Sequence, residues 1–314
     1  MYAARHRASK SRAICAILFV GAGLLPLLAP GGTCAQEQKQ KRARPQIQWQ
    51  DGPTQADLGN VAQIQVPKGF KFTGIDGTRK FAELLENPVG GKEIGVMIPD
   101  LSEKDNGQGL WFILFEFDPI GYVKDGDQKD LNDQTISTIL SSIRAGTESA
   151  NQERQRRGWA TLSVVGWERQ PFYDPSSHNL VWGIRGSSIE NGKPSYSINY
   201  NTRILGREGV LSANLVVDPE QLSAVVPTYE KLVAGVSFKP GKSYAEMRPG
   251  DKIAEYGLIG LITGGVGAVA IKTGFFTKFL KPILVGIAVA FGAVVKGIKS
   301  FFGKVTGLAG KESA

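Results

Sequence analysis

The stretch that decides the fold is LVWGIRGSSIENGKPSYSINYNTRILGREGVLSANLVV, residues 180–217. Apolar and polar side chains alternate along it with a period of two, which is typical of β-strands. Asn191-Gly192 and Gly206–Gly209 interrupt the alternation with residues that favour tight turns. We therefore expect three consecutive antiparallel strands with one buried face. The buried face would hold Leu180, Trp182, Ile184, Tyr196, Ile198, Tyr200, Thr202, Ile204, Leu211, Ala213, Leu215 and Val217.

Further strands are predicted before and after this meander. Short apolar runs indicate strands over 62–66, 70–73, 94–98 and 110–117, then over 159–169 and 235–238. Residues 111–115 are apolar without alternation, so this strand should be central and covered on both faces. No internal repeat is evident.

Three helices are predicted between the strands. Asp76 is a candidate cap for a short helix that ends at Asn87-Pro88, with Phe81, Leu84 and Leu85 turned inward. A second helix should start near Asn132 or Asp133, where Ile136, Ile139, Leu140 and Ile143 have helical spacing. Asp218-Pro-Glu-Gln221 is a capping sequence for a third. The inward side of that third helix would hold Leu222, Val225, Val226, Tyr229 and Leu232. The fold class expected is therefore α+β, a mainly antiparallel sheet with helices packed on it.

The N-terminus has the order of a secretory signal peptide. A basic start is followed by an apolar run from Ala13 and then by small residues that end in Thr33-Cys34-Ala35. We expect cleavage between Ala35 and Gln36. An uncleaved anchor is the alternative, and lipidation of Cys34 is disfavoured because Gly31 and Thr33 occupy the positions before it.

The C-terminus is expected to hold a transmembrane segment. The run from Gly257 to Ile271 contains fifteen uncharged residues, about 22 Å of helix, and extension past Lys272 would allow a full span. A second apolar run, 282–295, offers another span or the second arm of a hairpin. A buried helical hairpin of a soluble domain is the remaining alternative. The anchor residues singled out are Gly257, Gly260, Gly264, Gly265, Gly267 and Lys272, of which Gly260 and Gly264 suit close contact between helices and self-association.

These features divide the chain into four parts. We expect a cleavable signal over 1–35, a polar flexible leader over 36–60, an exported α+β domain over 61–250, and a Gly-rich anchor with a basic tail over 251–314. The positive-inside rule favours the lysine cluster from Lys272 to Lys281, which follows the first apolar run, on the cytoplasmic side. The domain would then lie on the exported side of the membrane.

The formal charge of +8 is concentrated at the two ends of the chain. Residues 1–35 contribute +4, residues 36–271 contribute −2, and residues 272–314 contribute +6. The nearly neutral middle argues against a nucleic-acid partner, because such a domain would carry its own basic surface. The two cysteines, Cys15 and Cys34, lie within the signal, so the mature chain should lack disulfides and thiolate sites.

Few residues of the domain favour catalysis. His178 follows Asp174, Ser176 and Ser177 within one Pro-containing turn, where a catalytic triad would be cramped, so a surface turn is the preferred interpretation. Residues 125–136 are as acidic as a calcium loop, but Lys129 and Ile136 occupy ligand positions. We expect no metal and no cofactor. A pair of carboxylates leaves no sequence signature and stays open. The five tryptophans, Trp49, Trp111, Trp159, Trp167 and Trp182, are expected mostly in the core or on the sheet.

Several separated motifs resemble one bacterial protein family. They are Gly158-Trp159, Val165–Trp167, Pro171–Asp174, Leu180–Trp182, Asn199-Tyr200, Arg203–Val210, Asn214–Val216 and Arg248–Gly257. This order is similar to that of the uncharacterised membrane-anchored family filed as domain of unknown function 2167. The resemblance implies an exported domain with a C-terminal anchor in Gram-negative bacteria. The chain would then lie in the bacterial inner membrane, in contact with its lipid, with the domain in the periplasm. The resemblance implies no activity or catalytic residues. The order of elements also loosely resembles the PsbP-like fold, an analogy that carries no function.

The function expected is a non-catalytic binding or interaction module of the cell envelope, with an envelope protein as its partner. One alternative is a carboxylate-based envelope hydrolase, which would show paired Asp or Glu side chains with perturbed pKa values. Another is a membrane organiser that acts through its Gly-rich helix.

Overall fold

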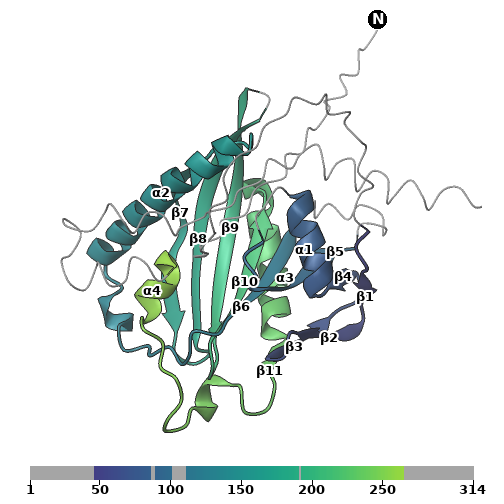
Figure 1. Ribbon diagram of the computed structural model, residues 1–314, viewed down its shortest axis with the longest axis vertical. Helices are drawn as coiled ribbons and strands as arrows, with labels where there is room; N and C mark the ends of the chain where they lie inside the picture. Colours follow the sequence, from purple (N-terminus) through teal and green to yellow (C-terminus); the bar gives the residue numbers. More distant parts are fainter. Residues whose placement is uncertain (1–45, 86–88, 101–110, 191, 265–314) are drawn as a thin grey trace, which may run out of the picture.

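The computed structural model describes residues 46–85, 89–100, 111–190 and 192–264 (Figure 1). Eight strands form the main sheet in the order β1-β4-β5-β6-β10-β9-β8-β7, and three form a second sheet in the order β11-β3-β2. The strands are β1 (Gln50–Asp51), β2 (Thr54–Leu58), β3 (Ala62–Val66), β4 (Phe70–Thr73), β5 (Glu93–Pro99), β6 (Phe112–Asp118), β7 (Leu162–Asp174), β8 (Asn179–Glu190), β9 (Lys193–Leu205), β10 (Val210–Val217) and β11 (Val236–Phe238). The helices are α1 (Ile75–Leu84), α2 (Asp133–Arg156), α3 (Leu222–Ala234) and α4 (Leu258–Thr263). The mainly antiparallel α+β class is confirmed.

The meander of β8, β9 and β10 is confirmed, but the expectation of a single buried face is wrong. All eight residues of β10 are buried, and the side chains of Asn199 and Asn201, expected to face solvent, are 1% and 4% exposed. The strands stay in register, so that Trp182 lies opposite Asn201 and Asn201 lies opposite Asn214. Elements packed on both faces of these strands explain the difference.

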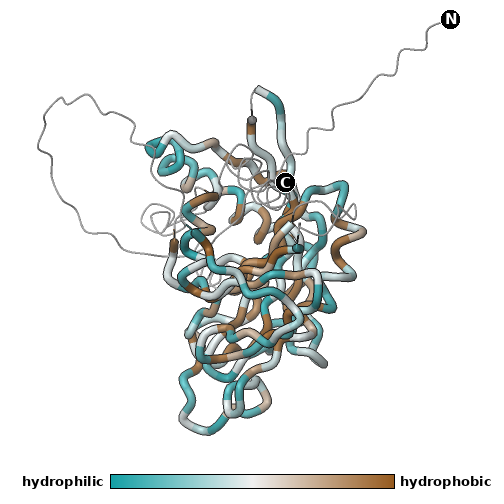
Figure 2. Tube along the Cα trace, turned by 90° about the vertical axis from the view of Figure 1, so that its right-hand side faces the viewer, coloured by the Kyte–Doolittle hydropathy of each residue, from teal (hydrophilic) through white to brown (hydrophobic). Residues whose placement is uncertain are grey.

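Different elements cover the two faces of the main sheet (Figure 1). On one face, α2 and α4 pack over β7 and β8 around Leu180 and Trp182, while α1 packs over β5 and β6. On the opposite face, α3 and the second sheet close a separate core that includes Tyr200, Leu215 and Tyr229. The mostly hydrophobic stretches lie in the central strands, whereas the outer turns are mainly hydrophilic (Figure 2).

The edge strand β7 is protected by side chains of α2. Arg144 donates hydrogen bonds to the carbonyl oxygens of Val164 and Val165, at 3.2 and 2.6 Å. The amide of Asn151 both donates to the carbonyl oxygen of Leu162 and accepts from its N–H. Because an open edge strand invites pairing with another chain, these contacts occupy backbone groups that would otherwise be available for it.

The fold begins earlier than the predicted leader allows. Strands β1 and β2 lie within 36–60, and β2 pairs with β3 in full register. Ala56 and Leu58 are buried in β2 while Gln55 and Asp57 are exposed, so this strand does alternate. The alternation is short and set among polar residues, which is why composition alone assigns it to a leader.

The helix starts follow the capping rules in one case out of three. The side chain of Asn132 caps α2 by accepting from the N–H of Thr135, as predicted. Helix α1 instead has Gly74 at its N-cap, and Asp76 lies in the first turn, where a negative charge still favours the helix dipole. Asp218 makes no capping hydrogen bond, because a 3₁₀ turn over Pro219–Gln221 precedes α3.

The last described helix, α4, belongs to the core of the domain. Leu258, Ile259, Leu261 and Ile262 are buried in the cluster under α2, and the helix ends at Gly264 with a φ of 74°. Within the part of the chain that the structure describes, no helix has the length and apolar character needed to cross a bilayer. The remainder of the predicted anchor, residues 265–314, lies outside the described residues, as do the signal and its cleavage site at Ala35 and Gln36.

Candidate functional site

A row of polar side chains crosses the middle of the main sheet. Arg203 of β9 lies opposite Ser212 of β10, Ser212 lies opposite Glu116 of β6, and Glu116 lies opposite Glu93 of β5. A neighbouring row places Asn201 opposite Asn214. We name this set, with Asn199, the polar stripe. It lies on the face that carries α1, α2 and α4, between the apolar clusters under α1 and under α2.

The polar stripe contains a chain of hydrogen bonds from a cation to a carboxylate. Nη1 of Arg203 donates to Oδ1 of Asn214 at 2.7 Å, and Nδ2 of Asn214 donates to Oε2 of Glu116 at 2.9 Å. The two contacts fix the orientation of the amide, because its oxygen must face the donor and its nitrogen the acceptor. Asn214 therefore bridges two charged groups from neighbouring strands.

The charged ends of this chain have shifted pKa values. Burial is the main cause that raises the pKa of Glu116, to about 7. The charge of Glu93 raises the same pKa further, while Arg203 and Lys92 lower it. Burial also lowers the pKa of Arg203, whose guanidinium lies over the ring of Trp182 at 4.8 Å. Glu116 can therefore serve near neutral pH either as a hydrogen-bond donor or as an acceptor.

Glu93 and Glu116 form a carboxylate pair of the kind that leaves no trace in sequence. Glu93 is buried, and its two oxygens accept from the backbone N–H groups of Gly90 and Gly91 at 2.5 and 2.7 Å. The nearby Asp118 is paired with Lys92 at 2.7 Å. Within the pair, Glu116 is the residue that has no backbone N–H donor to its carboxyl group among the described residues.

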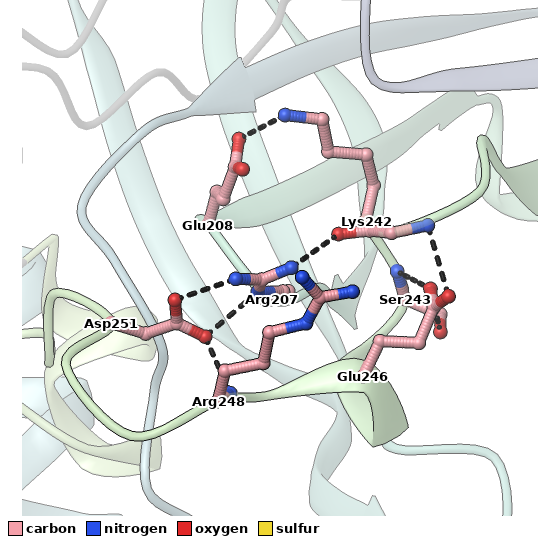
Figure 3. Close-up of polar contacts among 8 residues, drawn as sticks. Arg207, Glu208, Lys242, Ser243, Glu246, Arg248 and Asp251 are labelled. Carbon is pink, nitrogen blue, oxygen red and sulfur yellow. Dashed lines mark hydrogen bonds and ion pairs between the residues drawn. The ribbon is translucent and has the colours of Figure 1, made fainter.

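A second polar cluster fixes the C-terminal segment, residues 239–264, to the turn between β9 and β10 (Figure 3). Nε and Nη2 of Arg207 donate to the two oxygens of Asp251, both at 2.7 Å, and Asp251 also accepts from the N–H of Arg248. Lys242 pairs with Glu208 at 2.5 Å. The hydrogen bond from Arg207 is the main cause that lowers the pKa of Asp251, to about 2. We name this set the clamp.

The clamp continues into the docking of α4. Beyond Asp251, the backbone of Lys252 accepts from the N–H of Tyr122, and the N–H of Ala254 donates back to Tyr122. The carboxylate of Asp127 then accepts from the N–H groups of Leu258 and Ile259, at 3.0 and 3.2 Å. The C-terminal segment is thereby held at successive points until it enters the core as α4.

His178 lies in an aromatic cluster rather than on an open turn. Its ring is half-buried, 4.3 Å from the ring of Tyr244, and its Nδ1 lies 3.1 Å from the hydroxyl of Tyr173. That hydroxyl donates to Asp125 at 2.9 Å, so Nδ1 of His178 carries the proton of the contact. The cluster joins the β7–β8 turn to the C-terminal segment.

The serines near His178 do not complete a triad. The hydroxyls of Ser176 and Ser177 each donate to Asp174 at 2.7 Å, which lowers the pKa of that carboxyl. These contacts agree with the interpretation of residues 174–178 as a turn. Its left-handed residue is His178 itself, with a φ of 53°.

The profile of the family described as "Protein of unknown function (DUF2167)" matches residues 50–295, which is most of the chain. This chain belongs to the DUF2167 family. The family expected from the motifs is thus confirmed. In the DUF2167 chain several of these motifs meet in space. Arg203 and Asn214 belong to the polar stripe, the ring of Trp182 lies against Arg203, and Arg207 and Asp251 form the clamp.

Comparison with other proteins adds no function to the DUF2167 chain. No curated protein matches it. One solved structure, the solution structure of cyanobacterial PsbP (CyanoP) from Synechocystis sp. PCC 6803, matches with 10% identity and a TM-score of 0.35. That match covers 67% of this chain and all of the other.

The carboxylates of the acidic loop, residues 125–136, accept hydrogen bonds from other parts of the domain. Asp125 accepts from Tyr173, and Asp127 caps α4. Over residues 46–264, apart from the three short gaps, no group of three or more His, Cys, Asp and Glu side chains is placed to hold a metal ion. The loop therefore positions helices and tyrosines in this family member.

Three of the glycines expected in the membrane anchor lie among the described residues, and each has a structural role within the folded domain. A Cβ on Gly257 would lie 2.6 Å from the Asp127 carboxylate, and one on Gly260 would lie 2.5 Å from the ring of Tyr256. Gly264 supplies the left-handed end of α4. A contact between two anchor helices through Gly260 would require α4 to leave the core. Gly265, Gly267 and Lys272 lie outside the described residues.

Sequence reasoning missed the polar stripe, although a signal for it was present. The residues that alternate with the apolar face of β9 are Ser195, Ser197, Asn199, Asn201 and Arg203, of which only Arg203 is charged. A row of neutral amides and hydroxyls suits a buried face, where each polar group has a fixed hydrogen-bond partner. The position of Glu116 depended on long-range register and had no local signal.

Proposed function

We propose that this chain is an exported binding module of the bacterial cell envelope. A signal over residues 1–35 would carry it out of the cytoplasm, and the apolar C-terminal region would hold it in the inner membrane with the domain in the periplasm. The module would bind another envelope component and would not catalyse a reaction.

The observation that carries this proposal is the way the chain leaves the domain. Helix α4 is capped by Asp127 and buried under α2, and the apolar residues 265–271 follow it without a hydrophilic linker. Short attachment of this kind suits a domain held close to a membrane surface. It also restricts the orientation of the domain relative to whatever follows Gly264.

Docking of α4 also bears on which apolar run crosses the membrane. Helix α4 and its two cap residues, Gly257 and Gly264, use eight of the fifteen residues in the first run, which leaves seven uncharged residues before Lys272, about 10 Å if helical. The second run, 282–295, has fourteen, about 21 Å. We therefore favour the second run as the span while α4 stays docked, with Lys281 on the periplasmic side.

Cysteine labelling tests this topology, because both cysteines of the chain, Cys15 and Cys34, lie within the proposed signal that cleavage would remove. Single variants Lys281→Cys and Ser300→Cys would be treated with a membrane-impermeant maleimide in cells with a permeabilised outer membrane. We expect labelling at 281 and protection at 300, with Lys193→Cys on the domain as the labelled control. Protection at 281 would favour the first run as the span, and equal labelling at all three sites in cells with an intact inner membrane would refute the anchor.

Binding is favoured over hydrolysis by the state of the carboxylate pair. A carboxylate-based hydrolase needs two side chains in different roles, one as acid and one as base or nucleophile. Glu93 is held by two backbone N–H groups, so a single carboxyl of the pair is left for proton transfer. Photo-crosslinking from the domain in intact cells, followed by affinity purification, should recover one specific envelope component. Recovery of only abundant proteins would count against the proposal.

A further inference from the structure

The polar stripe leaves one cation and one carboxyl group with unused hydrogen-bonding capacity. Arg203 has five N–H donors, and among the described residues it uses one of them, toward Asn214. Within the same described part of the chain, Glu116 accepts a single hydrogen bond, also from Asn214. Both side chains keep part of their surface exposed, unlike Asn201 and Asn214 between them. The unused donors of Arg203 and the unused oxygen of Glu116 thus lie at the two ends of the hydrogen-bonded chain.

The guanidinium of Arg203 is held in place before any ligand arrives. Trp182 lies against it at 4.8 Å, and Asn214 holds Nη1 at 2.7 Å. Two fixed contacts set both the plane and the rotation of the group. A guanidinium fixed in this way presents paired donors that match the two oxygens of a carboxylate or a phosphate.

Among the residues that the structure describes, no carboxylate pairs directly with the guanidinium of Arg203. Glu93 is satisfied by backbone N–H groups, and Asp118 is paired with Lys92. Tyr256, from the C-terminal segment, and Tyr229, from α3, are the other titratable groups that act on Arg203. Glu116 is kept from its cation by the intervening amide of Asn214. An oxyanion beside Arg203 would complete the charge balance.

We infer that Arg203 and Glu116 bind a small ligand that carries a carboxylate or a phosphate group. Arg203 would donate two hydrogen bonds to the ligand oxygens, and protonated Glu116 would donate its O–H to the same oxyanion. This deepens the proposed binding role and rests on it, because it names the chemistry that the module recognises.

The proton on Glu116 makes the binding dependent on pH. With a pKa of about 7, the carboxyl group is about 90% protonated at pH 6 and about 10% protonated at pH 8. An ionised Glu116 would repel the oxyanion. The affinity for a ligand that does not itself titrate in this range should therefore fall about tenfold between pH 6 and pH 8.

The test uses the purified full-length chain in detergent micelles, with tryptophan fluorescence as the readout because Trp182 contacts Arg203. Sodium acetate and inorganic phosphate are the two probes, each titrated against sodium chloride at constant ionic strength. We expect saturable binding of at least one probe, and the tighter one identifies the ligand group. For acetate, the dissociation constant should rise about tenfold from pH 6 to pH 8.

Three variants separate this site from a merely structural network. Glu116→Gln keeps the hydrogen bond from Asn214 and should bind acetate equally at pH 6 and pH 8. Arg203→Lys keeps the positive charge but lacks the paired donors of a planar guanidinium, so it should bind the probe at least fivefold more weakly. Arg185→Lys, at an arginine paired with Glu168 on the opposite face, should bind as the wild type does. Circular dichroism verifies that each variant is folded.

The inference would be overturned by the absence of saturable binding for both probes at both pH values. It would also be overturned if Arg185→Lys weakened binding as much as Arg203→Lys, or if Glu116→Gln kept the pH dependence. These results are independent of localisation, because the purified chain is used. A failure of the labelling or crosslinking experiments would therefore be distinguishable from a failure here.

Discussion

Replacing Asp127 by Ala tests how α4 is held in the domain. The carboxylate of Asp127 accepts from the N–H groups of Leu258 and Ile259, and all three residues are buried. Hydrogen bonds to a charged group contribute about 1.5–3 kcal/mol, and loss of an N-cap side chain costs about 0.5–2 kcal/mol. Because both contacts share one carboxylate, we expect the free energy of unfolding to fall by about 2–4 kcal/mol.

The same structure predicts that α4 nevertheless stays docked in this variant. Four of its side chains, Leu258, Ile259, Leu261 and Ile262, are buried, and each contributes about 1.5–3 kcal/mol by its removal from water. Their sum of about 6–12 kcal/mol exceeds the capping loss. The change should therefore show as lower stability of a folded domain rather than as a detached helix.

Urea unfolding followed by tryptophan fluorescence measures the effect, with hydrogen exchange at the amides of 258 and 259 as a local readout. The matched control is Asp130→Ala in the same loop, which should change stability by less than about 0.5 kcal/mol. Equal stabilities for Asp127→Ala and Asp130→Ala would refute the reasoning. So would unchanged exchange rates at the two amides.

Three further changes test other parts of the fold. Gly95→Ala should lower the free energy of unfolding by about 2 kcal/mol or more in urea, because the added Cβ would lie 2.6 Å from the ring of Phe72. The pKa of Asp251 is held at about 2 by Arg207, below its usual 3.8, so the stabilisation is present above about pH 4 and is lost as the pH falls toward 2. The melting temperature, measured by thermal unfolding between pH 5 and pH 2, should thus fall more steeply in the wild type than in Asp251→Asn. Arg144→Ala uncovers two carbonyl groups of β7 and should increase light scattering at high protein concentration; unchanged scattering would contradict a protective role.

Local sequence patterns were sufficient to predict most elements of the fold. The alternation over 180–217 predicts three strands in the right order, and the spacing from Ile136 to Ile143 predicts α2 with its cap at Asn132. These signals are strong because each depends on residues close in the chain. The β2 strand was missed since its alternation spans five residues, too few to stand out from a polar surrounding.

The candidate site could not be predicted because it depends on register between distant strands. Glu116 and Asn214 are 98 residues apart, and they meet only through the pairing of β6 with β10. The placement of α4 has the same origin. An apolar, Gly-rich run suits a membrane and a protein core equally well. The burial of Leu258–Thr263 in the core involves residues far away in the sequence, among them Asp127, 131 residues earlier.

The position of the polar stripe itself argues for a role beyond stability. The rows on either side of it, and the whole opposite face of β9 and β10, are filled mainly with apolar side chains. Replacing a buried ionic network by well-packed apolar residues of similar volume is often neutral or stabilising, so stability alone does not account for Arg203 and Glu116 in this place. The amide of Asn214 spans the two charges and satisfies one donor and one acceptor, yet it leaves most of the guanidinium unused. A network that served only stability would pair Arg203 directly with Glu116. The amide of Asn214 lies between them instead, and it leaves hydrogen-bonding groups of both side chains available to a ligand.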